Sequence, residues 1–331
     1  MSAAGKTDTR RILVVRLGAM GDVLHALPAV TSLKHSHPGS RLTWAIEPKW
    51  APLIEQNPFV DRVVLVRRGS FSALSSSYRD LRAERYDIAV DFQGLIKSAL
   101  VASAARAERI FGFSTDLLRE RLAGVFYSDK TPSGAAHVVD RNLDLAAAAG
   151  ASTRLRVFPV PEGRPEGNLP EGDFVLASPL GGWPAKQWPR AHYRVLAERL
   201  RGELGLPLVV NLPPGADWSE PPAVPHVSAL PGLIHATRRA AAIVGIDSGP
   251  MHLAAALSKP GVAIFGPTDP ARNGPYGGSF QVLRAPGAET TYKRDASGDS
   301  IQRVSPGQVF EALRAILAEG RAPGRPANCC V

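Results

Sequence analysis

The chain has 331 residues, of which 44% are hydrophobic and 21% are charged, and this length favours two domains with a core each. The sequence predicts neither a membrane-spanning helix nor a secretory signal, because it has no run of about 18 apolar residues and its first residues include no apolar stretch. The formal net charge of +9 suits an anionic partner, but no nucleic-acid-binding motif occurs, so we expect a cytoplasmic protein that binds no nucleic acid.

Cysteine usage gives no sign of disulfides or zinc. The two cysteines, Cys329 and Cys330, are adjacent, so they cannot cross-link a core, and no Cys/His spacing is typical of a zinc site. We therefore expect no metal site. The sequence leaves the oligomeric state open.

The first half of the chain alternates between short aliphatic runs and helix-like segments. Strands are predicted at residues 12–15, 42–46, 63–66, 88–91 and 109–113. Helices are predicted at 22–34, 76–85 and 95–105. The strands are almost continuously apolar, which is typical of a parallel sheet buried on both faces. This βαβα order predicts a Rossmann-like domain over residues 1–159.

The second half repeats this order after an interruption. Residues 160–173 are rich in Pro, Gly and Glu and are predicted to be a linker. Strands are then expected at 174–178, 208–212, 243–247, 262–265 and 281–284, and helices at 190–204, 232–240, 249–257 and 306–319. We predict a second Rossmann-like domain over 174–319, with a last helix that could pack back on the first domain, and a disordered tail over 320–331. The fold class is thus α/β, with two such domains facing each other across a cleft.

An aspartate follows the first predicted strand. The segment Arg16-Leu17-Gly18-Ala19-Met20-Gly21-Asp22 turns on its glycines, and Asp22 then opens a helix, which it can cap. A carboxylate at the carboxyl end of a strand can also be a general base toward an alcohol. Both roles stay open. A dinucleotide fingerprint is a weak match, because Met20 stands where that motif requires its second glycine.

Loops in the second half favour a phosphate-bearing ligand. Ser248 and Gly249 begin a helix directly after Asp247, and a helix N-terminus is a ready site for a diphosphate, with His252 in the same turn. Lys186 lies in a Gly/Trp/Pro loop after Gly181 and Gly182, where its charge could neutralise a diphosphate leaving group without a metal. A structural His and a solvated Lys are the alternatives. Turn chemistry alone explains most of the 266–277 loop.

Cationic and amide side chains follow strands of the first half. They are Arg67, Arg68, Gln93, Lys97 and Arg119. Arginine clusters bind phosphates and carboxylates in bidentate fashion, and these side chains could face Asp22 across the mouth of the site. For any single arginine, a role in surface solubility is the simpler explanation.

Together these segments resemble glycosyltransferase family 9, the ADP-heptose:lipopolysaccharide heptosyltransferases. The resemblance rests on residues 21–28, 91–97, 137–141, 247–252 and 266–270, and it is closer to type I than to type II. It implies the GT-B architecture. It also implies inverting, metal-independent transfer of L-glycero-D-manno-heptose from ADP-heptose to a Kdo residue of the lipopolysaccharide inner core, without a cofactor. The acceptor, Kdo-lipid A, would place the protein peripherally on the cytoplasmic face of the inner membrane.

The resemblance also implies roles for individual residues. Asp22 would be the catalytic base and Lys186 the catalytic cation that faces the diphosphate. The donor-binding residues would be Gly181, Gly182, Lys186, Glu220, Asp247, Ser248, Gly249 and His252. The acceptor-binding residues would be Gly21, Arg67, Arg68, Gln93, Lys97 and Arg119. Glu220 would replace an acidic residue that family members place before a helix, and prolines at 221, 222 and 225 forbid that helix here.

Three other functions remain open on the sequence alone. A relative could use another sugar nucleotide or acceptor. A nicotinamide-dependent dehydrogenase is disfavoured by Met20, and a non-catalytic sugar-nucleotide binder is disfavoured by the combination of Asp22, Lys186 and His252.

Overall fold

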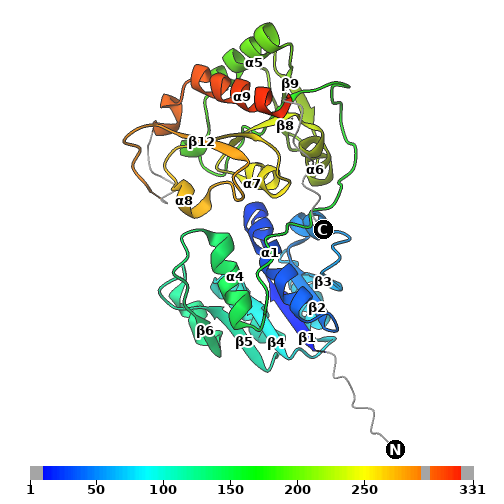
Figure 1. The fold of residues 1–331 in the computed structure, drawn as a ribbon. Coiled ribbons are helices and arrows are strands. Elements are labelled where there is room, and N and C mark those ends of the chain that lie inside the picture. The colour runs from blue at the N-terminus through cyan, green and yellow to red at the C-terminus, as the bar shows by residue number, and fades with distance from the viewer. Residues whose placement is uncertain (1–9, 292–298, 322–331) are drawn as a thin grey trace, which may run out of the picture. The chain divides into compact units, whose positions relative to one another are not determined.

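The computed structural model describes residues 10–291 and 299–321 of the chain. The chain divides into two compact units, Met1–Pro161 and Glu162–Val331 (Figure 1). Each unit contains its own six-stranded sheet, and all the strand pairs in both sheets are parallel. This confirms the predicted α/β class.

The sheet of the first unit has the strand order β3-β2-β1-β4-β5-β6. Its strands are β1 (Arg11–Val15), β2 (Arg41–Ile46), β3 (Arg62–Leu65), β4 (Ile88–Asp91), β5 (Arg109–Phe113) and β6 (Asp129–Thr131). Its helices are α1 (Met20–Ser36), α2 (Phe71–Arg82), α3 (Ile96–Ala104) and α4 (Val138–Ala148), with 3-10 turns η1 (Pro48–Ile54) and η2 (Arg121–Phe126). The order reverses beside β1, which is where open α/β sheets bind ligands.

The central strand explains why this unit forms a stable sheet. Four consecutive β1 residues, Ile12 to Val15, are fully buried, because helices cover both faces of the sheet. On one face α1 packs against α4, and the Asn142 side chain of α4 donates a hydrogen bond of 2.9 Å to the carbonyl of His25 in α1. The start of α1 is therefore held rigidly over the sheet.

The sheet of the second unit has the strand order β12-β11-β10-β7-β8-β9. Its strands are β7 (Val175–Ala177), β8 (Leu208–Leu212), β9 (Val224–Val227), β10 (Ala242–Ile246), β11 (Gly261–Phe265) and β12 (Phe280–Arg284). Its helices are α5 (Arg190–Leu204), α6 (Leu230–Arg239), α7 (Gly249–Ala256), α8 (Pro270–Asn273) and α9 (Pro306–Arg321), with 3-10 turns η3 (Pro184–Lys186) and η4 (Ser300–Arg303).

The last helix belongs to the core of the second unit. It packs against α5, β10 and β11, and its residues Val309, Phe310 and Leu313 are fully buried. The indole N–H of Trp188 donates a hydrogen bond of 2.8 Å to the carbonyl of Val304, which ties the segment before α9 to the loop before α5.

The structure also contains elements that the sequence analysis lacks. These are β6, α4, β9 and the short α8. The prolines near 221–225 lead into the edge strand β9, and no helix forms between β8 and β9. Residues 160–173 form no helix or strand. Most of the segment 320–331, including Cys329 and Cys330, lies outside the described residues.

Candidate functional site

Strand register brings three loops of the first unit to one edge of the sheet. Val15, the last residue of β1, pairs with Ala45 of β2 and with Asp91 of β4. The chain therefore leaves these three strands side by side at their carboxyl ends. The loops that follow carry Asp22, Glu47 and Gln93.

Asp22 is the third residue of α1 and is held by two donors. Its Oδ1 lies 2.7 Å from Nη2 of Arg16, and its Oδ2 accepts a hydrogen bond of 3.2 Å from the backbone N–H of Ala19. The Asp22 side chain is nevertheless 39% exposed, so the oriented carboxylate can be reached from solvent. It caps its helix and is also available as a base, and Gly21 precedes it in the first turn.

Arg16 is a functional candidate that the sequence analysis did not single out. Its side chain is buried, and besides Asp22 it binds the carbonyl of Phe92 in the loop after β4. The loop after β4 is thus coupled to the carboxylate of Asp22. The sequence does show an arginine directly after the first strand, but only the folded structure shows that its side chain is directed toward Asp22.

Gln93 joins two of the loops, and Asp91 anchors it. The Oε1 of Gln93 accepts a hydrogen bond of 2.9 Å from the backbone N–H of Leu17. The fully buried Asp91 accepts hydrogen bonds from Tyr127 at 2.7 Å, from Ser98 at 2.8 Å and from the Gln93 N–H at 2.8 Å. Burial raises the pKa of Asp91, and these hydrogen bonds oppose the rise. Asp91 therefore stabilises the loop that presents Gln93.

The carboxylate of Glu47 lies close to two of the cations that were predicted on the acceptor side. Glu47, at the end of β2, forms an ion pair with Arg68 and lies 3.6 Å from Nζ of Lys97. Arg67 and Arg119 are exposed, and within the described residues neither contacts Asp22 or Glu47. The structure thus gathers Arg68, Lys97 and Gln93 at the same sheet edge as Asp22.

In the second unit, Asp247 is the centre of a tight cluster. Its Oδ2 lies 2.6 Å from Nζ of Lys186 and accepts a hydrogen bond of 2.6 Å from Thr268. Its Oδ1 lies 3.8 Å from Nε2 of His252. Burial alone would raise the pKa of Asp247, but the neighbouring His252 and the positive charge of Lys186 hold it well below its ordinary value of 3.8. Asp247 is therefore an anion that fixes the position of a cation.

The start of α7 offers an anion site beside this cluster. Ser248 is the N-cap, and its hydroxyl oxygen is buried without a hydrogen-bond partner among the described residues. Gly249 offers its N–H at the first position of the helix, whereas Pro250 has no N–H and the N–H groups of Met251 and His252 donate to the Ser248 carbonyl. A buried hydroxyl without a partner is costly unless a ligand satisfies it. A phosphate group can accept from the Ser248 hydroxyl and the Gly249 N–H together.

The loop that carries Lys186 is held by its neighbours. The Lys186 ammonium lies 4.4 Å from the centre of the Trp183 ring, and the Gln187 side chain donates a hydrogen bond of 3.1 Å to the carbonyl of Gly181. A Cβ at Gly181 would lie 3.2 Å from the end of the Ile246 side chain, which is a tight contact, whereas Gly182 has open space. The ammonium group of Lys186 therefore has a fixed position and is not freely solvated.

Glu220 is not part of this cluster. It lies in the irregular segment between β8 and β9, is partly exposed, and makes no contact with Lys186 or Asp247 in the described part of the chain. The Glu220 carbonyl accepts a hydrogen bond from the N–H of Ala223.

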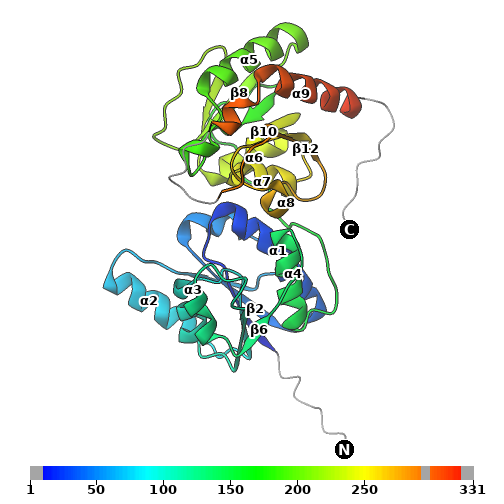
Figure 2. The ribbon, with the colours of Figure 1, turned by 90° about the vertical axis from the view of Figure 1, so that its left-hand side faces the viewer.

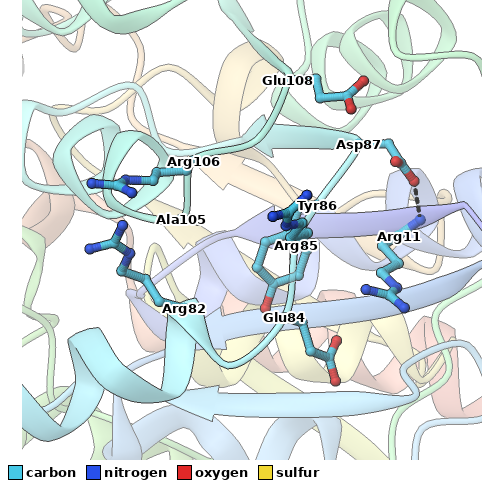
Figure 3. Close-up of a pocket in the computed structure, with 9 residues that line it drawn as sticks. All are labelled: Arg11, Arg82, Glu84, Arg85, Tyr86, Asp87, Ala105, Arg106 and Glu108. Atoms are coloured by element: carbon cyan, nitrogen blue, oxygen red, sulfur yellow. Dashed lines mark hydrogen bonds between the residues drawn. The ribbon is translucent and has the colours of Figure 1, made fainter.

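A separate cavity of about 640 Å³ lies at the opposite edge of the first sheet, at the amino ends of β1, β4 and β5 (Figure 3). Its lining is mostly charged and consists of Arg11, Arg82, Glu84, Arg85, Tyr86, Asp87, Ala105, Arg106 and Glu108. Asp87 accepts a hydrogen bond of 2.6 Å from the backbone N–H of Arg11. None of the predicted site residues lines it.

The described part of the chain has no candidate metal site and no candidate membrane span. No group of three His, Cys, Asp or Glu side chains there could hold a metal ion. No helix in residues 10–291 and 299–321 is long and apolar enough to cross a membrane.

Comparison with known proteins identifies relatives over most of the chain. Residues 75–216 and 227–301 match glycosyltransferase family 9 (heptosyltransferase). The chain is 32% identical over 303 residues to lipopolysaccharide heptosyltransferase 1 of Escherichia coli (strain K12), covering 83% of this chain and 94% of the relative. It is 33% identical over 303 residues to the protein of the same name from Pseudomonas aeruginosa PAO1, covering 81% and 82%.

Solved structures agree with these matches. E. coli heptosyltransferase WaaC with ADP superimposes with a TM-score of 0.75 at 28% identity, covering 92% of this chain and 99% of that one. E. coli ADP-heptose lps heptosyltransferase II superimposes with a TM-score of 0.73 at 24% identity, covering 94% and 100%. The fold is accordingly that of the GT-B heptosyltransferases. The chain is a transferase that belongs to glycosyltransferase family 9, the heptosyltransferase family.

Proposed function

We propose that this protein transfers L-glycero-D-manno-heptose from ADP-heptose to a Kdo residue of the lipopolysaccharide inner core. The observation that carries the proposal is the Lys186–Asp247–His252 cluster beside the open hydroxyl of Ser248 at the start of α7. The identity to proteins named lipopolysaccharide heptosyltransferase 1 and the likeness to WaaC with ADP support it.

On the donor side, the second unit supplies charge for the diphosphate. Lys186 is already fixed by Asp247, so little reorganisation is needed when negative charge builds up on the leaving ADP. Ser248 and Gly249 hold phosphate oxygens at the helix start. Asp247 and the loop glycines Gly181 and Gly182 complete the donor site, and Asp247 contacts the sugar.

On the acceptor side, Asp22 acts as the general base. It takes the proton of the attacking Kdo hydroxyl while that oxygen bonds to the anomeric carbon and the bond from this carbon to the ADP oxygen breaks. Attack from the face opposite ADP inverts the anomeric centre. Arg68 and Lys97, which meet at Glu47, bind the acceptor's carboxylate or phosphate groups, and Arg67 and Arg119 extend this basic rim.

The proposed reaction requires no metal and no cofactor, because Lys186 and the start of α7 neutralise the diphosphate. A lipid-linked acceptor places the enzyme on the cytoplasmic face of the inner membrane.

A donor and acceptor assay tests the proposal directly. The purified protein is expected to transfer heptose from ADP-heptose to Kdo-lipid A, in the presence of EDTA, and to do so faster than it transfers sugar from UDP- or GDP-linked donors. Lys186→Ala is expected to weaken ADP binding on the order of tenfold to a hundredfold, because a charge-assisted contact is worth roughly 1.5–3 kcal/mol. Lys259→Ala is the matched control, since its ammonium donates to the Arg238 carbonyl away from the cluster.

Two results would contradict this function. One is transfer that stops when EDTA is added and returns with Mg²⁺. The other is unchanged ADP affinity in Lys186→Ala, measured by calorimetry beside the Lys259→Ala control.

A second candidate is a family 9 transferase that uses another nucleotide. The observation in its favour is the segment between β8 and β9, where the prolines replace a helix and Glu220 stays apart from the donor cluster. Tighter binding of UDP or GDP than of ADP in the same calorimetric experiment would favour this candidate.

A further inference from the structure

Six exposed large apolar side chains, among them the five most exposed of the described residues, lie on three elements of the first unit. They are Phe71, Leu74 and Tyr78 of α2, Leu100 of α3, and Leu122 and Val125 of η2, and we call this set the apolar surface. Phe71 is 88% exposed and all but Tyr78 are at least 50% exposed, whereas no other large apolar side chain in the described chain exceeds 45%. The helix α3 contacts both α2 and η2, and α2 and α3 lie side by side in Figure 2.

Helix α2 shows that these positions form an ordered stripe. Phe71, Leu74 and Tyr78 are spaced by three and four residues and so share one side of the helix. The buried contact of α2 with its own unit is made by other residues, Ser77 and Leu81. Large apolar groups in a contiguous exposed stripe mark an interaction site, because water around them is unfavourable.

The charge around the apolar surface is positive. Residues 67–82 contain four arginines, Arg67, Arg68, Arg79 and Arg82, against one acidic residue, Asp80. Arg82 continues the stripe of α2, with its guanidinium 5.0 Å from the centre of the Tyr78 ring. At the cavity of the opposite sheet edge, Arg82 lies beside Arg106 (Figure 3). An apolar stripe flanked by arginines is the composition of a helix that lies in the interface of an anionic membrane.

The position of the apolar surface relates it to the candidate acceptor side. The helix α2 begins three residues after Arg68, and α3 contains Lys97 in its first turn, so both helices start from the loops whose cations meet at Glu47. Phe71 at the start of α2 is therefore close in sequence to the cations, and the remaining apolar residues follow along the same helices.

We infer that the apolar surface docks this protein on an anionic lipid bilayer. The apolar side chains enter the boundary between headgroups and acyl chains, and Arg79 and Arg82 contact lipid phosphates. A second copy of the chain fits this surface poorly, because an isologous contact would bring the arginines of one copy against those of the other. The purpose of docking, access to a lipid-linked acceptor, rests on the proposed function, but docking itself does not.

Vesicle sedimentation tests the inference. The intact protein is expected to bind vesicles of phosphatidylethanolamine with phosphatidylglycerol, and to bind vesicles of phosphatidylcholine alone much more weakly. The double variant Phe71→Ser, Leu74→Ser is expected to lose on the order of tenfold or more in partitioning, since apolar burial is lost. Val195→Ser is the matched control, because Val195 is an exposed apolar residue of α5 in the other unit.

Variants of Arg79 and Arg82 test the electrostatic part of vesicle binding independently. Arg79→Gln and Arg82→Gln are each expected to reduce partitioning to the anionic vesicles by on the order of fivefold and to weaken its salt dependence. Arg201→Gln, which replaces an exposed arginine of α5, is expected to have little effect. All variants should keep the thermal midpoint of the intact protein, which excludes unfolding as the cause.

The outcomes separate docking from catalysis. Equal partitioning of the Phe71/Leu74 variant and the intact protein, or no binding to anionic vesicles, overturns the inference. So does a dimer, seen by sedimentation velocity without lipid, that the same variant converts to monomers. With a water-soluble Kdo acceptor, the variant should transfer heptose as fast as the intact protein. Absence of that transfer in both proteins, with vesicle binding intact, counts against the proposed function and leaves docking standing.

Discussion

Asp22 performs two physical tasks with one carboxylate. It accepts the Ala19 N–H near the start of α1, as an N-terminal acidic residue should, and it forms an ion pair with the buried Arg16. The sequence offered two roles for Asp22, a helix cap and a general base; the contact with Ala19 confirms the cap, and the general base stays a prediction. Arg16 was not predicted, because only the folded loop after β4 shows that its guanidinium is directed to Asp22 and Phe92.

Replacing Asp22 with Asn separates helix capping from the proposed role as general base. The amide oxygen can still cap the helix, and the lost ion pair is partly exposed, so we expect unfolding free energy to fall by about 1 kcal/mol or less. The transfer rate should fall by roughly 10²–10⁴-fold, because the general base is gone. Steady-state transfer, thermal unfolding and ADP calorimetry together measure the three quantities, and ADP affinity should not change.

Asp61→Asn is the matched control for this experiment. Asp61 pairs with Lys34 at 2.8 Å and is as exposed as Asp22, but it lies before β3, away from the candidate site. Its variant should lose a similar amount of stability and keep full activity. If Asp22→Asn also keeps full activity per folded molecule, Asp22 is only a cap.

The lowered pKa of Asp247 predicts how the stability of the protein depends on pH in acid. Its pKa is lowered in the folded state, so the unfolded chain takes up the proton first as the pH falls through the ordinary value of 3.8. The stabilisation from the ionised group is thus complete above this value and is lost below it, with a slope of at most about 1.4 kcal/mol per pH unit. Denaturant unfolding at several pH values should show a steeper loss of stability below about pH 4 in the intact protein than in Asp247→Asn. Parallel curves would contradict the assignment.

Among the elements, the loop between β4 and α3 depends on a buried carboxylate. Tyr127 donates to Asp91, and its ring fills the space where Gly112 has no side chain, since a Cβ there would lie 2.3 Å from the ring. The contact joins η2, β5 and β4 into one support for the Gln93 loop. A substitution at Tyr127 should therefore affect the position of the Gln93 loop through Asp91.

We therefore expect Tyr127→Phe to destabilise the protein by about 1.5–3 kcal/mol, because a hydrogen bond to a buried carboxylate is lost. Tyr193→Phe is the control, since the buried Tyr193 hydroxyl has no hydrogen-bond partner among the described residues and its removal should be neutral or stabilising. Denaturant unfolding of both variants measures the difference. Equal stability of the two variants would show that the Tyr127–Asp91 contact contributes nothing.

The elements that could be predicted from the sequence are those with a strong apolar period. Uninterrupted apolar residues indicate buried strands such as β1 and β10, and periodic apolar residues indicate the long helix α5. The strand β9 was missed because its proline and its exposed valines carry no such signal, and β6 was missed because its three residues, Asp129 to Thr131, are all polar. Partners such as Thr268 at Asp247 were missed because loops far apart in sequence meet only after folding.

At the scale of the whole molecule, each unit has its own sheet and its own buried core. The donor-side residues Lys186, Asp247 and Ser248 all belong to the second unit, while Asp22 belongs to the first. The proposed function therefore assigns donor binding to the second unit and proton transfer to the first.

Hydrogen exchange can observe this division. On addition of ADP, we expect the strongest protection at the start of α7 and in the loop of η3, because ADP occupies their N–H groups and fixes Lys186. The amides of β1 and β4 should change little. Protection centred on the loop after β1 instead would place the nucleotide in the first unit and contradict the donor assignment.

The edges of the two sheets have a consequence for the behaviour of concentrated solutions. Of the four edge strands, β3, β6 and β9 have three or four residues, and β9 contains Pro225, which has no N–H to offer, whereas the fourth, β12, has five residues. Short edges with a proline are poor templates for strand addition. In concentrated solution we therefore expect strand addition between copies of this chain to be disfavoured at β3, β6 and β9, and any such association to begin at β12.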